Sequence, residues 1–492
     1  MKQTKNSPYF SKITGVIALV VAGSVLMFSC KKTNSTTVQQ AYTPGGQVVQ
    51  PGNISGAIKG TMETNQTYDV TGDVIINSGD SLIIQPGAKI VFQGAYNFFI
   101  KGNLFSLGSA ASPVVFTYQN QQRIDNPSEP VASDPAYQGL WGGLWADTSC
   151  PNLVVKWTHL DFGGAPIAAA QPPIAGASTG DSYNIFFQNP NGNFILEDSW
   201  LYGGTDDAIR LKSGHFSVMR NTFEKGGGTG GDLMNVKGGG IGDCAYNLYM
   251  GCATNGPKAS DKGQPGSQQT NCDFYNNTII NSGYRMVELG RGGSINYEEG
   301  AKGMAYNNMI INCRFGLRIV GATQSYLGNA LVVADTAHIQ YGYTFNYSDS
   351  VAGVNQFYPV TPDTSATGAG GVPTSGLWTR PQSTDIPNII SIVPAGYYPG
   401  APYENAAVDA LAGQNNPKFV NFPLPEAATP SSIAYVTGYD FHLASGSPAI
   451  GKGFTGFQPL VTVPQGGQYG ATITPPGADM GAYQSNGTGN QH

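Results

Sequence analysis

The chain has 492 residues, of which only 11% are charged, and its formal net charge is −6. No basic stripe is present that could release counterions from phosphates, so nucleic acid is not an expected partner. The length would allow two or three domains, although a chain of this length can also fold as a single domain built from repeats.

The N-terminal residues form a targeting segment. Lys2 and Lys12 precede an apolar run at 13–28, which is shorter than the roughly 20 residues needed to span a bilayer. The run ends just before Cys30 and resembles a bacterial lipoprotein signal peptide. This resemblance implies a signal peptide at 1–29 and acylation of Cys30. It also implies a lipid-anchored protein of the cell envelope, at the outer membrane, that faces the periplasm or the cell surface.

A flexible tether is expected at 30–50, because this segment is polar and contains Pro and Gly. Downstream, a polar residue followed by a short apolar strand recurs. The recurring residues are Asp198, Asn221, Asn277, Asn308 and Asn329. Their spacing is 21 to 31 residues, apart from one step of 56 that Asn247 divides. This period predicts a parallel β-helix, in which asparagine accepts left-handed turn geometry and bonds to the asparagine of the next coil.

Several longer segments support this fold. Residues 74–94, 98–117 and 140–164 combine apolar strands with Pro-Gly, Gly-x-Leu and Trp-Gly-Gly turns. They resemble bacterial right-handed parallel β-helix proteins of the pectin-lyase-like group. The resemblance implies an all-β fold, a right-handed parallel β-helix solenoid with long inserted loops.

The expected organisation has three parts after the tether. The β-helix is predicted at 51–335, a loop-rich extension packed on it at 336–438, and a closing segment with a tail at 439–492. Residues 251–271 are predicted to be an inserted polar loop. The sequence at 405–413 favours a short helix.

Strand alternation places the side chains of successive coils in columns. The residues predicted to point inward are Ile209, Leu211, Met234, Val236, Val287, Leu289, Leu317 and Ile319. The outward residues expected to bind a ligand are Trp145, Phe186, Arg210, Asn235, Glu288 and Arg318, with Gln188, Lys212 and Lys237 in a second column. Just before the strands lie Asp207, Asp232 and Arg285, and Arg285 is also expected to bind the ligand.

Opposite charges, amides and aromatic rings on a rigid sheet suit a sugar polymer. The expected function is therefore binding of a polysaccharide, a cell-surface glycan or another extracellular partner, by a monomer. The simplest alternative is a structural or adhesive rod. Its surface charges would pair along the stack, such as Arg285 with Asp232 or Glu288 with Arg318.

Two enzymatic alternatives also stay open. Residues 205–214 resemble the second motif of the polygalacturonase family, which implies Asp206 and Asp207 as acid and base, with Asp232 beside them. Residues 212–223 resemble part of the chondroitinase B and alginate lyase group, which implies Lys212 as the base. Either enzyme would act on an acidic polysaccharide.

Five cysteines remain after Cys30, namely Cys150, Cys244, Cys252, Cys272 and Cys313. An oxidising compartment allows disulfides, and a bridge among the three that border 251–271 would staple that loop. No zinc-type spacing accompanies them, and the histidines are scattered, so neither a metal nor a cofactor is expected.

Overall fold

The computed structural model describes residues 47–126, 129–169, 174–261, 268–286, 293–314, 316–319, 324–326, 329–331, 335, 338–349, 416–424 and 435–492, with only the backbone at 319, 324–326 and 329–331. The predicted signal peptide, Cys30, Glu288, the short helix at 405–413 and most of the predicted extension lie outside these residues. No helix among the described residues has both the length and the apolar character needed to cross a bilayer.

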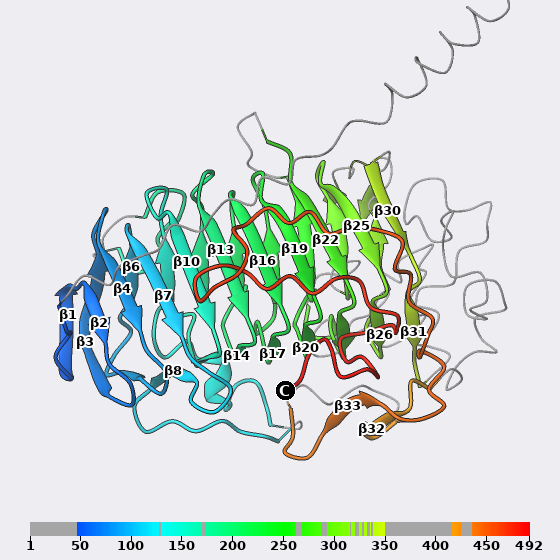
Figure 1. Ribbon diagram of the computed structural model, residues 1–492, viewed down its shortest axis with the longest axis horizontal. Helices are drawn as coiled ribbons and strands as arrows, with labels where there is room; N and C mark the ends of the chain where they lie inside the picture. Colours follow the sequence, from blue (N-terminus) through cyan, green and yellow to red (C-terminus); the bar gives the residue numbers. More distant parts are fainter. Residues whose placement is uncertain are drawn as a thin grey trace, which may run out of the picture. The chain divides into compact units, whose positions relative to one another are not determined.

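The described chain winds into coils that each contribute a strand to three parallel rows (Figure 1). The first row is a 10-stranded sheet. Its strands are β2 (Gly60–Met62), β4 (Ser81–Ile84), β7 (Asn103–Leu107), β10 (Asn152–Lys156), β13 (Asn193–Glu197), β16 (His215–Met219), β19 (Ile241–Ala245), β22 (Asn271–Tyr275), β25 (Lys302–Tyr306) and β30 (Ile339–Gly342).

The second and third rows belong to one 19-stranded sheet, because β3 (Thr67–Ile76) pairs with the first strand of both rows and with β1 (Gly52–Ala57). The second row contains β5 (Lys89–Phe92), β8 (Val114–Tyr118), β11 (Thr158–Asp161), β14 (Trp200–Tyr202), β17 (Thr222–Glu224), β20 (Leu248–Met250), β23 (Thr278–Ile280), β26 (Met309–Ile311) and β31 (Phe345–Tyr347). The third row contains β6 (Phe98–Ile100), β9 (Leu144–Ala146), β12 (Ile185–Phe187), β15 (Ile209–Leu211), β18 (Met234–Val236), β21 (Pro257–Ser260), β24 (Asn296–Glu298) and β27 (Arg318–Ile319).

This arrangement confirms the predicted all-β fold and the parallel β-helix. The short elements outside the rows are the 3-10 turn η1 (Pro135–Tyr137), the antiparallel pair β28 (Gln324–Tyr326) and β29 (Asn329–Leu331), and the antiparallel pair β32 (Phe419–Asn421) and β33 (Asp440–Leu443). The inward prediction is confirmed for Ile209, Leu211, Met234 and Val236, which are fully buried in the core that fills the coils.

A polar ladder lies at the corner between the first and second rows. Asn221, Asn247, Asn277 and Asn308 are fully buried there. The backbone N–H groups of Asn221, Asn247 and Asn277 each donate to the side-chain oxygen of the next asparagine, at 2.9 to 3.1 Å and at spacings of 26, 30 and 31 residues. The predicted coil boundary at Asn247 is therefore confirmed.

Two of the predicted markers are wrong in detail. The ladder position next to Asn221 is Ser199, whose N–H donates to the Asn221 side chain at 2.9 Å; Asp198 lies one residue earlier. Asn329 begins β29, an antiparallel strand outside the rows, so it marks no coil.

The left-handed turn conformation belongs to the residue before each ladder member. The φ angles are 52° at Asp198, 56° at Arg220, 58° at Tyr246, 50° at Asn276 and 61° at Asn307. The ladder asparagines thus serve as hydrogen-bonding groups, and the turn is tolerated by whichever residue precedes them.

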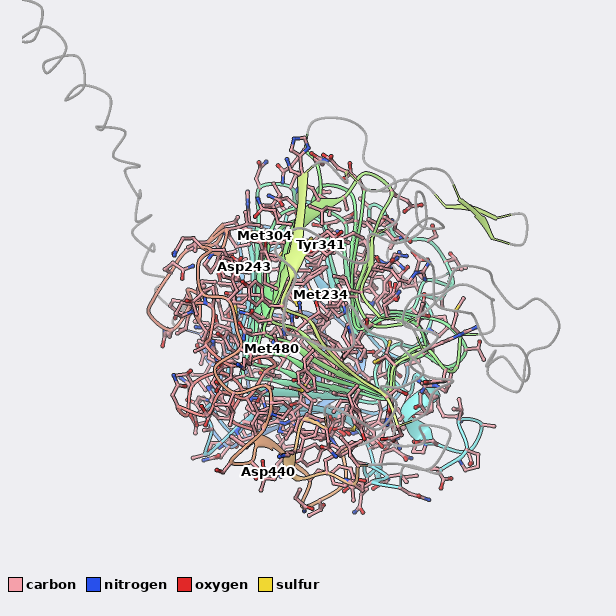
Figure 2. The ribbon with its side chains drawn as sticks, turned by 90° about the vertical axis from the view of Figure 1, so that its right-hand side faces the viewer. Met234, Asp243, Met304, Tyr341, Asp440 and Met480 are labelled. Atoms are coloured by element: carbon pink, nitrogen blue, oxygen red, sulfur yellow. The ribbon has the colours of Figure 1, made fainter. Side chains whose placement is uncertain are left out.

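The first row is covered on its outward side by residues 454–475, here called the strap. In Figure 1 the strap runs in orange and red across the first-row strands. Its Leu460 and Val461 N–H groups donate to the Asp243 carboxylate at 2.9 and 2.8 Å, and its Thr472 N–H donates to Glu197 at 2.6 Å. Figure 2, viewed from the right-hand end of Figure 1, places Asp243 toward the strap and Met234 in the interior.

The second row is covered by a different part of the chain. Its outward residues Leu248, Met309 and Phe345 pack against Phe419 and Phe441, which come from β32 and β33. The first row and the later part of the second row are therefore covered by other segments of the protein. The third row differs in chemistry, because much of its outward face is charged or amidic.

Candidate functional site

The outward column of the third row follows from the strand register. Its members, one from each successive coil, are Phe99, Trp145, Phe186, Arg210, Asn235, Lys258, Asn296 and Arg318. The order predicted from Trp145 to Asn235 is the one observed. Glu288 was predicted at the next position, but Lys258 and Asn296 occupy the two coils before Arg318.

The predicted polar loop at 251–271 is therefore wrong in part, because residues 257–260 form the third-row strand β21. The strand that pairs with it in the row is β24, in which Asn296 lies opposite Lys258. Glu288 itself lies outside the described residues.

The aromatic end of the column is sealed. Trp145 and Phe186 are 0% exposed and pack with Ile167, Ile174 and Tyr183 from the segment before β12. The Trp145 indole N–H donates to the Asn97 side chain at 2.9 Å. These two rings lie where strand alternation placed them, but they form a small satellite core and are not exposed for binding.

A second ladder of polar side chains supports the polar end. Asp207 Oδ1 accepts the Asp232 backbone N–H at 2.7 Å. Asp232 Oδ1 in turn accepts the Asn255 backbone N–H at 3.1 Å and the Asn255 Nδ2 at 2.7 Å. Asp207, Asp232 and Asn255 are all buried, so this ladder fixes the starts of three neighbouring strands.

Two cations of the column, Arg210 and Lys258, form ion pairs with nearby carboxylates. Arg210 pairs with Asp207 at 2.5 Å, and its guanidinium lies over the Tyr183 ring at 4.6 Å from the centroid. Lys258 pairs with Glu298 and lies 3.9 Å from Asp232. These contacts hold both side chains in place and leave little free charge at this depth.

Lys212 and Lys237 are different, because neither forms an ion pair among the described residues. They lie at matching positions just after β15 and β18, and neighbouring coils are roughly 4.8 Å apart. Lys212 donates to the Gly176 carbonyl, and no hydrogen bond joins the Lys237 ammonium to another described residue. Burial lowers the pKa of both, and the nearby Arg210 lowers each further, with Lys258 adding to the effect on Lys237. An anion at this point would reverse that destabilisation of the charged form.

Asp206 is half-buried and directly precedes Asp207 at the turn before β15. Burial raises the pKa of its carboxyl to about 7, and the adjacent Asp207 charge contributes in the same direction. A carboxyl group with this pKa is able to donate a proton near neutral pH.

Arg285 has a structural role that the sequence did not indicate. Its guanidinium donates to the carbonyls of Gly226, Gly227 and Gly251 at 3.0, 2.8 and 2.9 Å, and it lies 5.0 Å from the Tyr137 ring centroid. It thereby clamps the loop after β17, and the predicted ion pair with Asp232 is not formed. Arg318 is 5% exposed and closes the described part of the column.

The described cysteines do not form the disulfide that was expected. All five cysteines among the described residues are free and buried, so the predicted bridge among Cys244, Cys252 and Cys272 is not formed. In the same part of the chain, no three His, Cys, Asp or Glu side chains converge in a way that could hold a metal ion.

Comparisons with protein-family models, with curated proteins and with solved structures found no match for this chain. The arrangement itself offers two unpaired ammonium groups, a carboxyl group that titrates near neutrality and a set of fixed amides. Such a face can bind an anionic, hydroxyl-rich molecule, and its acid–base groups can act on one.

Proposed function

We propose that the polar end of the third row, between Asp206 and Arg318, binds an acidic glycan. The observation that carries this proposal is the lysine pair Lys212 and Lys237. Most other charges on this face are neutralised by described side chains, whereas these two ammonium groups lie on neighbouring coils without a carboxylate partner. A uronic-acid carboxylate would supply that partner, and its hydroxyl groups suit the neighbouring amides.

Binding to polygalacturonate is expected to fall on the order of tenfold in Lys212→Gln and in Lys237→Gln. Each change removes a charge-assisted contact of about 1.5–3 kcal/mol, and 1.4 kcal/mol corresponds to tenfold in affinity. Affinity gel electrophoresis measures the effect, with carboxyl-reduced polymer as the neutral ligand. Lys89→Gln is the matched control, since Lys89 is an exposed lysine of the second row. Equal affinity of all three variants for polygalacturonate would contradict the proposal.

A second candidate function is hydrolysis of the bound glycan. The raised pKa of Asp206 favours it, because an acid catalyst must be protonated when the leaving oxygen departs, and Asp207 lies next to it as a carboxylate paired with Arg210. Elimination with Lys212 as the base is the other route. Its lowered pKa suits a base, and an unsaturated, ultraviolet-absorbing product would identify it.

If Asp206 is the acid, cleavage is expected to decline as pH rises through about 7, because the protonated form is lost above the pKa of the group. Reducing-end release from polygalacturonate between pH 5 and pH 9 measures this decline. Asp206→Asn should lack activity at every pH while keeping its affinity. Undiminished cleavage by Asp206→Asn would exclude the assignment.

The proposed location rests on Cys30 and its sequence context. A lipid-anchored β-helix would present this face to glycans at the envelope. Mass spectrometry of the mature N-terminal peptide tests the anchor, and an unmodified Cys30 would contradict it.

A further inference from the structure

Two carboxamides flank Lys258 in the outward column of the third row. Asn235 lies one coil before Lys258 and Asn296 one coil after it. Each asparagine is only 3% exposed. Both therefore lie below the surface of the face that the proposed glycan would cover.

Their orientation is set by neighbouring carboxylates. Asn235 Nδ2 donates to Asp232 Oδ2 at 2.9 Å, and Asn296 Nδ2 donates to Glu298 Oε2 at 2.8 Å. Burial raises the pKa of the Asp232 carboxyl, but the Lys258 ammonium lies beside both Asp232 and Glu298 and favours their ionised forms. An ionised carboxylate only accepts hydrogen bonds, so in both asparagines the amide nitrogen faces the carboxylate and the oxygen faces away. The amide assignment is thus dictated by chemistry.

Both amide oxygens are buried without a hydrogen-bond partner among the described residues. A buried acceptor in this state costs free energy, so such groups almost always meet a donor. The donor must be a compact group, either a water molecule or a small group that projects from a larger ligand, because each residue is only 3% exposed. It is also unlike a metal cation, because the Lys258 ammonium lies between the two residues in the column and would repel one. A hydroxyl group meets these conditions.

We propose that Asn235 and Asn296 are specificity-determining residues that accept hydrogen bonds from free hydroxyl groups of the bound glycan. This inference rests on the proposed function and deepens it. The lysine pair binds the carboxylate of the ligand, and the two carboxamides accept hydrogen bonds from its unmodified hydroxyl groups. An O-acetyl group replaces the hydroxyl hydrogen and adds bulk, so acetylated sugars are rejected.

The test compares polygalacturonate with its O-acetylated form. Wild-type protein is expected to bind the unmodified polymer at least tenfold more tightly, because a site built to accept a hydroxyl hydrogen discriminates strongly against its loss. Asn235→Leu and Asn296→Leu should each bring the ratio of the two affinities toward one. Asn193→Leu is the matched control, since Asn193 is a partly exposed asparagine of the first row whose amide bonds Asn152. Thermal unfolding of each variant establishes that it is folded. Because the two variants lie on separate coils, the test can still be made if one of them fails to fold.

The outcomes separate the two proposals. If wild-type protein binds neither polymer, the proposed function fails. If it binds both polymers equally, the proposed function stands and the specificity inference is overturned. If wild-type protein discriminates and both leucine variants keep the full ratio, the two oxygens bind buried water only, which also overturns the inference.

Discussion

Replacing Lys225 with methionine is expected to destabilise the protein by about 3–5 kcal/mol, which is the typical cost of breaking a buried ion pair from one side. Lys225 and Asp134 are both 0% exposed, and the ammonium also donates to the Ile124 carbonyl at 2.7 Å. Methionine keeps the apolar stem but leaves the Asp134 carboxylate buried without its cation. Chemical denaturation measures the free energy of unfolding.

The matched control is Lys59→Met, which breaks an exposed pair. Lys59 and Asp80 have 57% and 24% side-chain exposure, so the expected loss is less than about 1 kcal/mol. Adding Asp134→Asn to Lys225→Met should recover part of the lost stability, because the uncompensated charge is removed. If Lys225→Met and Lys59→Met were equally stable, the buried ion pair would contribute no more to stability than the exposed one.

The polar ladder between the first and second rows is the second place where a single side chain is expected to contribute strongly to stability. Asn277→Leu is expected to lower the free energy of unfolding by about 3–5 kcal/mol, since it leaves several buried groups unpaired at about 1–3 kcal/mol each. Asn277 Oδ1 accepts from the Asn247 backbone and side chain, and its Nδ2 donates to the Cys244 carbonyl and to Asn308.

Denaturation of Asn193→Leu gives the comparison for this variant. Asn193 donates to Asn152 in a partly exposed row of asparagines, where water can replace the lost bond. We expect its loss to stay under about 1 kcal/mol. A similar small loss in Asn277→Leu would mean that the ladder is not a main source of stability.

The coil spacing could be predicted from the sequence because the ladder asparagines recur in short, alternating strands. The prediction erred at Asp198, since two adjacent polar residues both fit a turn and only the register identifies Ser199 as the ladder member. The strand at 257–260 could not be found by alternation. Its sequence, Pro-Lys-Ala-Ser, offers only a proline and an alanine opposite the inward Met234 and Val236, and its neighbours in the sheet impose the extended form.

For the site, alternation sufficed to place Arg210, Asn235, Lys212 and Lys237 on one face, because a strand has a strict period of two. Burial of the aromatic end was not predictable in the same way. It depends on a covering segment, and apolar residues such as Ile167 within that Ala/Pro-rich stretch were the available signal.

The strap has a consequence for how the coils unfold. In a simple solenoid each coil touches only its neighbours, so the ends can fray independently. Here Tyr469 and Ala471 of the strap pack with Phe105 and Ile195, and Phe454 accepts a bond from Asn307, so one segment joins early and late coils. Such long-range contacts make unfolding cooperative across the stack of coils. They also slow folding, because the stack is complete only after a segment distant in sequence has packed against it.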